Sequence, residues 1–249
     1  MQNLFSDSIT ALFADHATPA AVRRAEKDGL DRGLWQLVTE SGFDKALAPE
    51  ALGGSGISLN EAGAVLEACG RFAAPIPLAE AMLAHGFAGL HNVELPAGAV
   101  TASLARSEGD TVRAHAVPWG GSADWVLAVE PEGQAFVFPV IKARSSLRSD
   151  IEGECEMLWR TGDARLVFTP HKKVEWRAVG AAMRVAQIAG ALDSVLELTT
   201  QYAGERNQFG RALAKFQAIQ QQVAMLAEDT FAARMASSLV CDSAGVLPD

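Results

Sequence analysis

The sequence predicts an α+β protein in three consecutive parts: an N-terminal helical domain over residues 1–98, a middle antiparallel β domain over residues 99–175 and a C-terminal helical hairpin over residues 176–249. Two observations predict this order. Apolar residues recur at three-to-four spacing in the first part and again after Pro170, which is the period of helices buried on one face. The stretch between them consists of short β-branched and aromatic runs separated by turns, which is typical of strands.

The first helices are predicted from apolar spacing. Two stretches before Gly42 place their apolar side chains on one helical face. These positions are Leu4, Phe5, Ile9, Leu12 and Phe13, then Leu30, Leu34, Leu37 and Val38. Residues 48–56 hold three glycines and are expected to form a loop. No strand precedes this loop and no Gly-Lys-Ser follows it, so we interpret it as structural rather than as a phosphate-binding loop.

Two further helices are predicted from their boundaries. Ser58 and Glu61 have the spacing of a capping box, which indicates a helix that begins after Ser58 and that Gly70 can end. Pro75 and Pro77 then mark a turn into a helix over residues 78–90.

The middle part reads as strands and turns. Five runs alternate in polarity or are rich in β-branched and aromatic residues, and glycine-containing pairs such as Gly109-Asp110 and Gly162-Asp163 separate them. The runs are Val112 to Val117, Trp125 to Val129, Ala135 to Val140, Glu156 to Trp159 and Arg165 to Phe168. They predict a small antiparallel β domain.

Helical spacing returns in the last part. One predicted helix carries Val185, Ile188, Leu192, Val195, Leu196, Thr199 and Tyr202 on one face, and a second carries Phe216, Ile219, Val223, Leu226 and Thr230. A hairpin covers each of these apolar faces from one side only. We therefore expect a further segment, a partner subunit or a second copy of the chain to pack against it.

Charge and composition exclude several classes of protein. The net charge of −9 disfavours a sequence-independent nucleic-acid binder, because neutralising phosphates needs clustered Lys and Arg. The three cysteines are widely spaced and odd in number, and the five histidines show no metal-ligand spacing, so neither a disulfide framework nor a metal site is indicated. The N-terminus has no signal pattern, and no uninterrupted apolar run approaches the length of a membrane span. We therefore expect a cytoplasmic protein that has no membrane-spanning segment.

The segment between the last two helices carries the candidate binding residues. It reads Tyr202-Ala-Gly-Glu-Arg206-Asn-Gln208-Phe209-Gly, and Phe216-Gln217-Ala-Ile-Gln follows. A guanidinium is a rigid, permanently charged fork of donors that meets phosphate oxygens in pairs, so Arg206 suits a pyrophosphate. Exposed amides at the start of the next helix would add to the attraction for an anion.

This pattern resembles the Y-x-x-x-R-x-Q-F-G … F-Q-x-I-Q signature of the acyl-CoA dehydrogenase family. The resemblance extends over about residues 20–240 and implies that the hairpin is part of a four-helix bundle. It also implies an FAD cofactor bound across a subunit interface by Arg206, Gln208, Phe209, Phe216 and Gln217. An acyl-CoA substrate and an electron-transfer flavoprotein as electron acceptor follow from the same resemblance.

The sequence departs from that family in three places. Thr101 to Asp110 stands where the family has its flavin- and thioester-lining segment, and Ala116-Val117-Pro118 lacks the family's flavin-contacting threonine, although Trp119 could replace lost aromatic surface. Most members carry the glutamate base in a later segment, and this chain stops before it, at Asp249. A minority carry it at the place of Gly180 and Ala181, which cannot take a proton.

Three functions remain open on the sequence. The first is an FAD-dependent acyl-CoA dehydrogenase that desaturates an acyl-CoA at its α,β bond, working as a homo-oligomer or hetero-oligomer. The second is a non-catalytic or half-site subunit of a heteromeric dehydrogenase, which would explain the missing base. The third is a helical scaffold or binding module without a cofactor.

Overall fold

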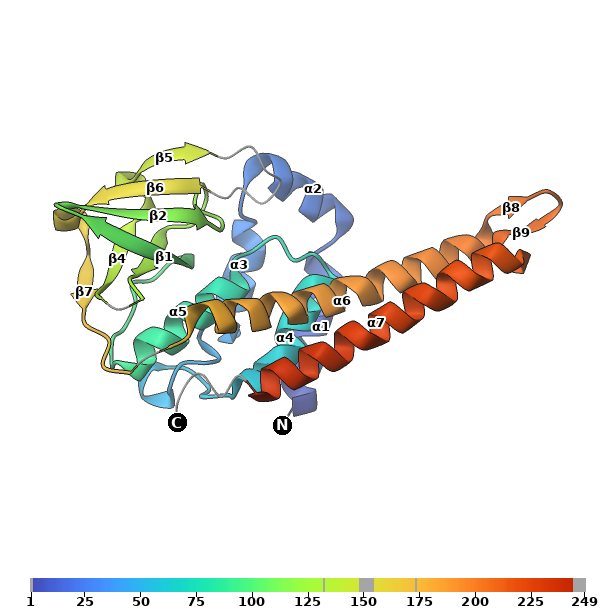
Figure 1. Cartoon of the computed structure of the whole chain (residues 1–249), viewed down its shortest axis with the longest axis horizontal. Helices are drawn as coiled ribbons and strands as arrows, with labels where there is room; N and C mark the ends of the chain where they lie inside the picture. Colours follow the sequence, from blue (N-terminus) through green and yellow to red (C-terminus); the bar gives the residue numbers. More distant parts are fainter. Residues whose placement is uncertain (1, 132, 148–154, 173, 244–249) are drawn as a thin grey trace.

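The computed structural model describes residues 2–131, 133–147, 155–172 and 174–243. Five helices form the N-terminal part: α1 (Gln2–His16), α2 (Pro19–Asp28), α3 (Arg32–Glu40), α4 (Leu59–Arg71) and α5 (Leu78–Leu90). They lie between a sheet on one side of the molecule and a long α6–α7 hairpin on the other (Figure 1). The α+β architecture predicted from the sequence is therefore confirmed.

The predicted capping box starts α4. The Ser58 side chain accepts from the Glu61 amide, and the Glu61 carboxylate accepts from the Ser58 amide at 2.8 Å. Gly70 does not end this helix, which continues to Arg71. A Cβ atom at Gly70 would lie 1.8 Å from the backbone oxygen of Gln187 on α6, so this glycine allows two helices to cross closely.

The segment before α4 is a loop, as expected. It contains two short 3₁₀ helices, η1 (Phe43–Lys45) and η2 (Glu50–Leu52). The Gly56 amide donates to the Ala48 carbonyl at 2.8 Å, and a Cβ at Gly54 would lie 2.0 Å from the same oxygen. The loop is thus folded back on itself through its own backbone.

The middle part is a seven-stranded sheet in the order β5-β6-β2-β1-β3-β4-β7. Its strands are β1 (Val100–Glu108), β2 (Thr111–Val117), β3 (Trp125–Val129), β4 (Ala135–Pro139), β5 (Arg144–Leu147), β6 (Cys155–Arg160) and β7 (Leu166–Phe168), with short 3₁₀ turns η3 (Val140–Lys142) and η4 (Thr161–Asp163). The predicted antiparallel sheet is wrong in one respect, because β1 and β3 pair in parallel. The turn at Gly109 (φ 64) brings β2 back along one edge of β1, and the chain then reverses again to reach the other edge.

The central strands are buried on both faces, so their apolar runs do not alternate with polar residues. Leu127 of β3 and Val137 of β4 pack against the helices in one core that includes residues of all three predicted parts. Val126 and Phe138 face a second core inside the folded sheet, where Phe138 stacks on Trp159 at 4.8 Å.

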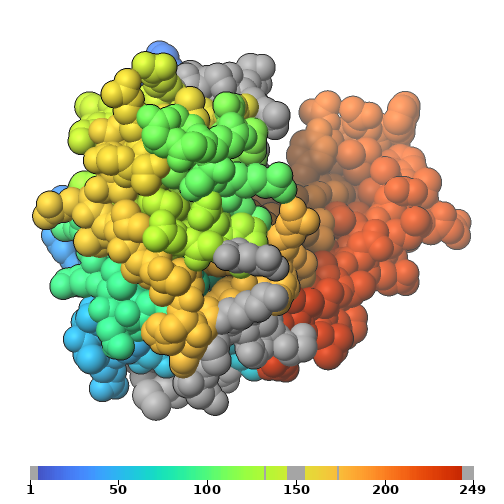
Figure 2. Space-filling model, turned by 60° about the vertical axis from the view of Figure 1, so that its left-hand side comes forward, coloured from blue at the N-terminus to red at the C-terminus, as the bar shows by residue number. Residues whose placement is uncertain are grey.

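The C-terminal hairpin consists of α6 (Trp176–Glu205) and α7 (Gln217–Ser243), joined by β8 (Asn207–Gln208), β9 (Arg211–Ala212) and the 3₁₀ turn η5 (Leu213–Lys215). Its outer half stands clear of the rest of the molecule (Figures 1 and 2). By length and composition α6 could also cross a membrane, alone among the described helices, but core helices pass the same test. Part of α6 is such a core helix, because it packs on α4 and α7.

The buried face of α6 differs from the predicted one. Ile188, Val195 and Tyr202, from the predicted apolar face, are exposed, whereas the buried face consists mainly of small residues. The buried residues are Val179, Ala182, Met183, Ala186, Ala189, Gly190 and Ala203. The reason is the close crossing with α4, which leaves no room for large side chains: a Cβ at Gly190 would lie 1.8 Å from the Glu67 carbonyl oxygen.

Candidate functional site

The first candidate site is the tip of the α6–α7 hairpin. Phe209 and Gly210 connect β8 to β9 and both have positive φ, 53° and 82°, which matches the two-residue turn typical of a tight β-hairpin. Arg206 follows the last residue of α6. Its amide donates to the Tyr202 carbonyl and its carbonyl accepts from the Leu213 amide, both at 2.9 Å. The backbone of Arg206 is therefore held on both sides while its side chain is exposed.

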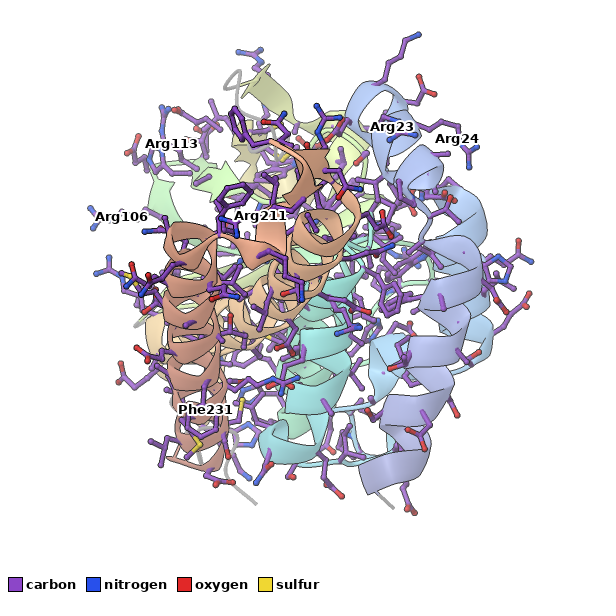
Figure 3. The ribbon with its side chains drawn as sticks, turned by 90° about the vertical axis from the view of Figure 1, so that its right-hand side faces the viewer. Arg23, Arg24, Arg106, Arg113, Arg211 and Phe231 are labelled. Carbon is purple, nitrogen blue, oxygen red and sulfur yellow. The ribbon has the colours of Figure 1, made fainter. Side chains whose placement is uncertain are left out.

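Aromatic contacts stabilise the tip. The rings of Phe209 and Phe216 meet edge to face at 6.2 Å, and the Arg211 guanidinium lies 4.1 Å from the centre of the Phe216 ring. Arg211 is at the end of the hairpin that faces the viewer in Figure 3. The sequence interpretation did not select Arg211, although an arginine in a short hairpin before an aromatic residue is a signal for such a cation–π pair.

The predicted cofactor-binding residues lie at this tip, and their side-chain polar groups are available to bind a ligand. Within the described part of the chain, the side chains of Arg206, Gln208 and Gln217 form no hydrogen bond or ion pair, and Phe209 is 90% exposed. Phe216 is half-buried beside them. The tip also offers the amides at the start of α7, a 27-residue helix. This donor set fits the pyrophosphate of a dinucleotide such as FAD.

The second candidate site is a cavity of about 150 Å³ between α5, β1 and the start of α6. It is lined by Ala79, Glu80, Leu83, Ala102, Ser103, Leu104, Pro118, Trp176, Gly180, Met183 and Arg184. Three of the sequence positions considered above therefore meet in one place: the segment after Thr101, the segment that ends at Pro118, and Gly180. The buried Thr101 hydroxyl fixes two of them together by donating to the Pro118 carbonyl at 2.8 Å.

The cavity has an aromatic wall that the sequence did not predict. Trp176 lines it and packs edge to face on Phe87 at 4.5 Å. Trp119, which could have replaced lost aromatic surface, is not among the lining residues. Its backbone has φ 56° and its carbonyl accepts from the amides of Ser122 and Ala123, so it shapes the β2–β3 connection instead.

The polar wall of the cavity is an ion pair. The Arg184 guanidinium on α6 donates to the Glu80 carboxylate on α5 at 2.5 Å, and to the Gln187 side chain at 2.6 Å. Glu80 is 7% exposed, so its charge is held in the interior by this partner. The sequence did not predict either residue as part of a site, because they are 104 positions apart and neither belongs to a motif.

Gly180 leaves space in the cavity. Nothing lies within 4 Å of a Cβ atom built on it. Neither Gly180 nor Ala181 carries an acidic side chain. A carboxylate at this position of α6 would therefore fit, but this chain has none there.

The cavity and the hairpin tip lie toward opposite ends of α6. Roughly 26 residues separate Gly180 from Arg206, which corresponds to about 39 Å at about 1.5 Å per residue. A dinucleotide cannot bridge that distance. The donors at the tip therefore cannot hold a cofactor whose reactive ring lies at the cavity of the same chain.

Two histidines that looked scattered in the sequence lie together beside the start of α6. The Nδ1 atoms of His91 and His171 are 3.0 Å apart, and Nε2 of His91 is buried without a hydrogen-bond partner in the described part of the chain. Burial, helped by His171 and Lys172, lowers the pKa of His91. Among the described residues no group of three metal-binding side chains occurs, here or elsewhere.

Two protein-family models match parts of this chain. The family described as "Acyl-CoA dehydrogenase, N-terminal domain" matches residues 1–94, and "Acyl-CoA dehydrogenase, C-terminal domain" matches residues 178–241. Acyl-CoA dehydrogenase IpdE2 of Mycobacterium tuberculosis is 32% identical, over 96% of this chain and 75% of the relative. Its namesake in Mycolicibacterium smegmatis is 30% identical, over 90% of this chain and 71% of the relative.

Solved structures show the same fold. A steroid ACAD, Tcur3481-Tcur3483, has a TM-score of 0.79 at 24% identity and covers 98% of this chain and 79% of its own. The ChsE4-ChsE5 complex of Mycobacterium tuberculosis has a TM-score of 0.74 at 21% identity, with 97% and 78% covered. The two matching family models, together with the shared fold, place the chain in a class of flavoprotein oxidoreductases. The chain belongs to the acyl-CoA dehydrogenase family.

Proposed function

We propose that this chain is a subunit of an FAD-dependent acyl-CoA dehydrogenase that forms an α,β double bond in an acyl-CoA thioester. The cavity beside Gly180 would hold the acyl group, and its apolar wall would exclude water from the reacting carbons. FAD, when bound, supplies the hydride acceptor, and an electron-transfer flavoprotein would receive the electrons.

The observation that supports this proposal is the group of exposed hydrogen-bond donors at the hairpin tip. Arg206 would bind the pyrophosphate by paired hydrogen bonds, Gln208 and Gln217 would add neutral hydrogen bonds, and Phe209 would offer apolar surface. Because the tip is about 39 Å from the cavity of its own chain, the cofactor held there would serve a neighbouring chain. The proposed enzyme is therefore an oligomer in which each hairpin completes another subunit's cofactor site.

The experiment compares flavin retention by Arg206→Ala and Lys215→Ala. Both variants remove one positive charge from the hairpin, and the Lys215 side chain is exposed. Loss of hydrogen bonds to a charged phosphate should weaken FAD binding at least about tenfold in Arg206→Ala. Lys215→Ala should keep the wild-type 450 nm absorbance per chain. Colourless wild-type protein in its natural assembly, or equal flavin loss in both variants, would contradict the proposal.

A second candidate function is supported by the space at Gly180. If the chain is a half-site subunit, a partner chain provides the general base and this chain provides Arg206 and structural support. The similar ChsE4-ChsE5 complex gives a precedent for two different chains in one assembly.

The variant Gly180→Glu tests the half-site role. It places a carboxylate in the open part of the cavity, where it should raise acyl-CoA-dependent dye reduction if only the base is missing. Gly204→Glu is the control, because Gly204 lies on the same helix with nothing within 4 Å of its Cβ and is outside the cavity. Co-purification with a second, glutamate-bearing chain would support the half-site role. Full activity of a homo-oligomer of this chain would contradict it.

A further inference from the structure

One wall of the cavity is charged although the cavity lies in an apolar part of the protein. Glu80 and Arg184 form an ion pair at 2.5 Å, in which the Glu80 side chain is 8% exposed and the Arg184 side chain 45%. Around them the lining side chains are mainly apolar, including Leu83, Met183 and Trp176. A ligand that fills the cavity therefore meets hydrocarbon on most sides and a carboxylate–guanidinium pair on one.

The chemistry of this pair selects among ligands. A hydrocarbon group would displace water from the pair without replacing its hydrogen bonds, which is unfavourable for charged groups. A carboxylate can only accept hydrogen bonds and a guanidinium can only donate them. A hydroxyl group does both, so it can donate to Glu80 and accept from Arg184 at once. A ligand carboxylate would instead be repelled by Glu80.

The volume limits the size of the group. An engineered cavity of about 150 Å³ in another protein holds a benzene-sized molecule, and this cavity has about the same volume. A six-membered ring or an acyl group of similar bulk therefore matches the space beside the ion pair.

We propose that Glu80 and Arg184 determine substrate specificity by selecting an acyl group whose far end carries a hydroxyl. The inference rests on the proposed function, because it takes the cavity as the acyl site. In this role Glu80 and Arg184 contact the distal hydroxyl and take no part in proton or hydride transfer.

The test uses two thioesters of matched size, cyclohexanecarboxyl-CoA and trans-4-hydroxycyclohexanecarboxyl-CoA. Their dissociation constants are measured by calorimetry on the natural assembly, and flavin reduction is followed separately. Hydrogen bonds to charged groups correspond to a preference of about tenfold to hundredfold for the hydroxylated thioester.

The variant is the double substitution Glu80→Leu with Arg184→Met. Removing Arg184 alone would leave the Glu80 charge buried without its partner and could prevent folding, whereas replacing both partners of an ion pair by apolar residues is often neutral for stability. The hydroxyl preference should fall to about one or reverse. The control is Asp193→Leu with Arg234→Met, which removes another pair that involves α6, at 2.5 Å and outside the cavity, and should keep the wild-type preference.

The outcomes of this test distinguish failure of the hydroxyl-specificity inference from failure of the proposed function. Equal binding of the two thioesters by the wild type, no binding of either, or an unchanged preference in the Glu80/Arg184 double variant would overturn the inference. Selective binding of the hydroxylated thioester without any flavin reduction would leave the inference standing and would contradict the proposed function instead.

Discussion

The close crossing of α4 and α6 predicts that Gly190→Ala destabilises the protein even though alanine favours helices. A Cβ at Gly190 would lie 1.8 Å from the Glu67 carbonyl oxygen and 3.0 Å from the Arg71 amide nitrogen. Both contacts are with backbone atoms, so no side chain can rotate away. The helices would have to separate by more than about 1 Å to restore ordinary contact distances.

The magnitude follows from two opposing effects. Overpacking a tight interior contact costs about 1–3 kcal/mol, and a contact with rigid backbone should reach the upper end of that range. Replacing glycine by alanine in a helix contributes about 1 kcal/mol in the other direction. The net expectation is a loss of about 2 kcal/mol of unfolding free energy. Separation of the helices would also disturb the hydrogen bond from Ser237 to Glu67, 2.8 Å long, which ties α7 to α4.

Urea unfolding followed by circular dichroism measures the effect, with Gly204→Ala as the matched control on the same helix. Gly204 has nothing within 4 Å of its Cβ, so the control should be neutral or up to about 1 kcal/mol more stable than the wild type. Gly190→Ala with wild-type stability would show that the two helices do not cross this closely. Equal destabilisation of both variants would have the same meaning.

Two further predictions concern pH and assembly. Burial lowers the pKa of His85 to about 4 from 6.5, so its contribution to stability is complete above pH 6.5 and is lost as the pH falls towards 4. That shift corresponds to about 3 kcal/mol of unfolding free energy, and Asp44, whose pKa is raised by burial, acts in the opposite direction. In His85→Phe the urea midpoint should therefore depend less on pH between pH 6.5 and 4. An unchanged pH dependence would contradict the role given to His85. Phe231 lies on α7 (Figure 3) and is 66% exposed. If other chains cover the hairpin, Phe231→Glu should reduce the size of the assembly in sedimentation velocity, whereas the control Gln221→Glu, at an exposed position of the same helix, should not. An unchanged sedimentation coefficient in both variants would exclude Phe231 from the interface.

Much of the local structure could be predicted because its causes lie within a few residues. The capping box at Ser58 depends only on neighbouring atoms and formed as expected. The apolar runs Trp125–Val129 and Ala135–Pro139 became β3 and β4. By contrast, β1 was not recognised as a strand, because its serines, threonine and charged residues dilute the apolar pattern.

The candidate sites divide in the same way. The hairpin tip is continuous in sequence, so the family resemblance of this one segment was enough to select both Arg206 and Gln208 as candidates. The cavity is assembled from α5, β1 and α6, and its ion pair joins Glu80 to Arg184 across 104 positions. In the sequence, a buried glutamate on an apolar helix looks the same as a glutamate on the solvent-exposed face of that helix.

By itself the sequence determined the α-β-α order, the helix start at Ser58 and the donor set around Arg206, because backbone geometry and motif spacing act over short distances. Only the tertiary structure decided that β1 and β3 run parallel, that Gly190 of α6 crosses closely over Glu67 of α4, and that Glu80 meets Arg184 beside the space left by Gly180. These features depend on which surfaces approach each other when the core forms, and burial and close packing choose among surfaces that periodicity alone leaves equivalent.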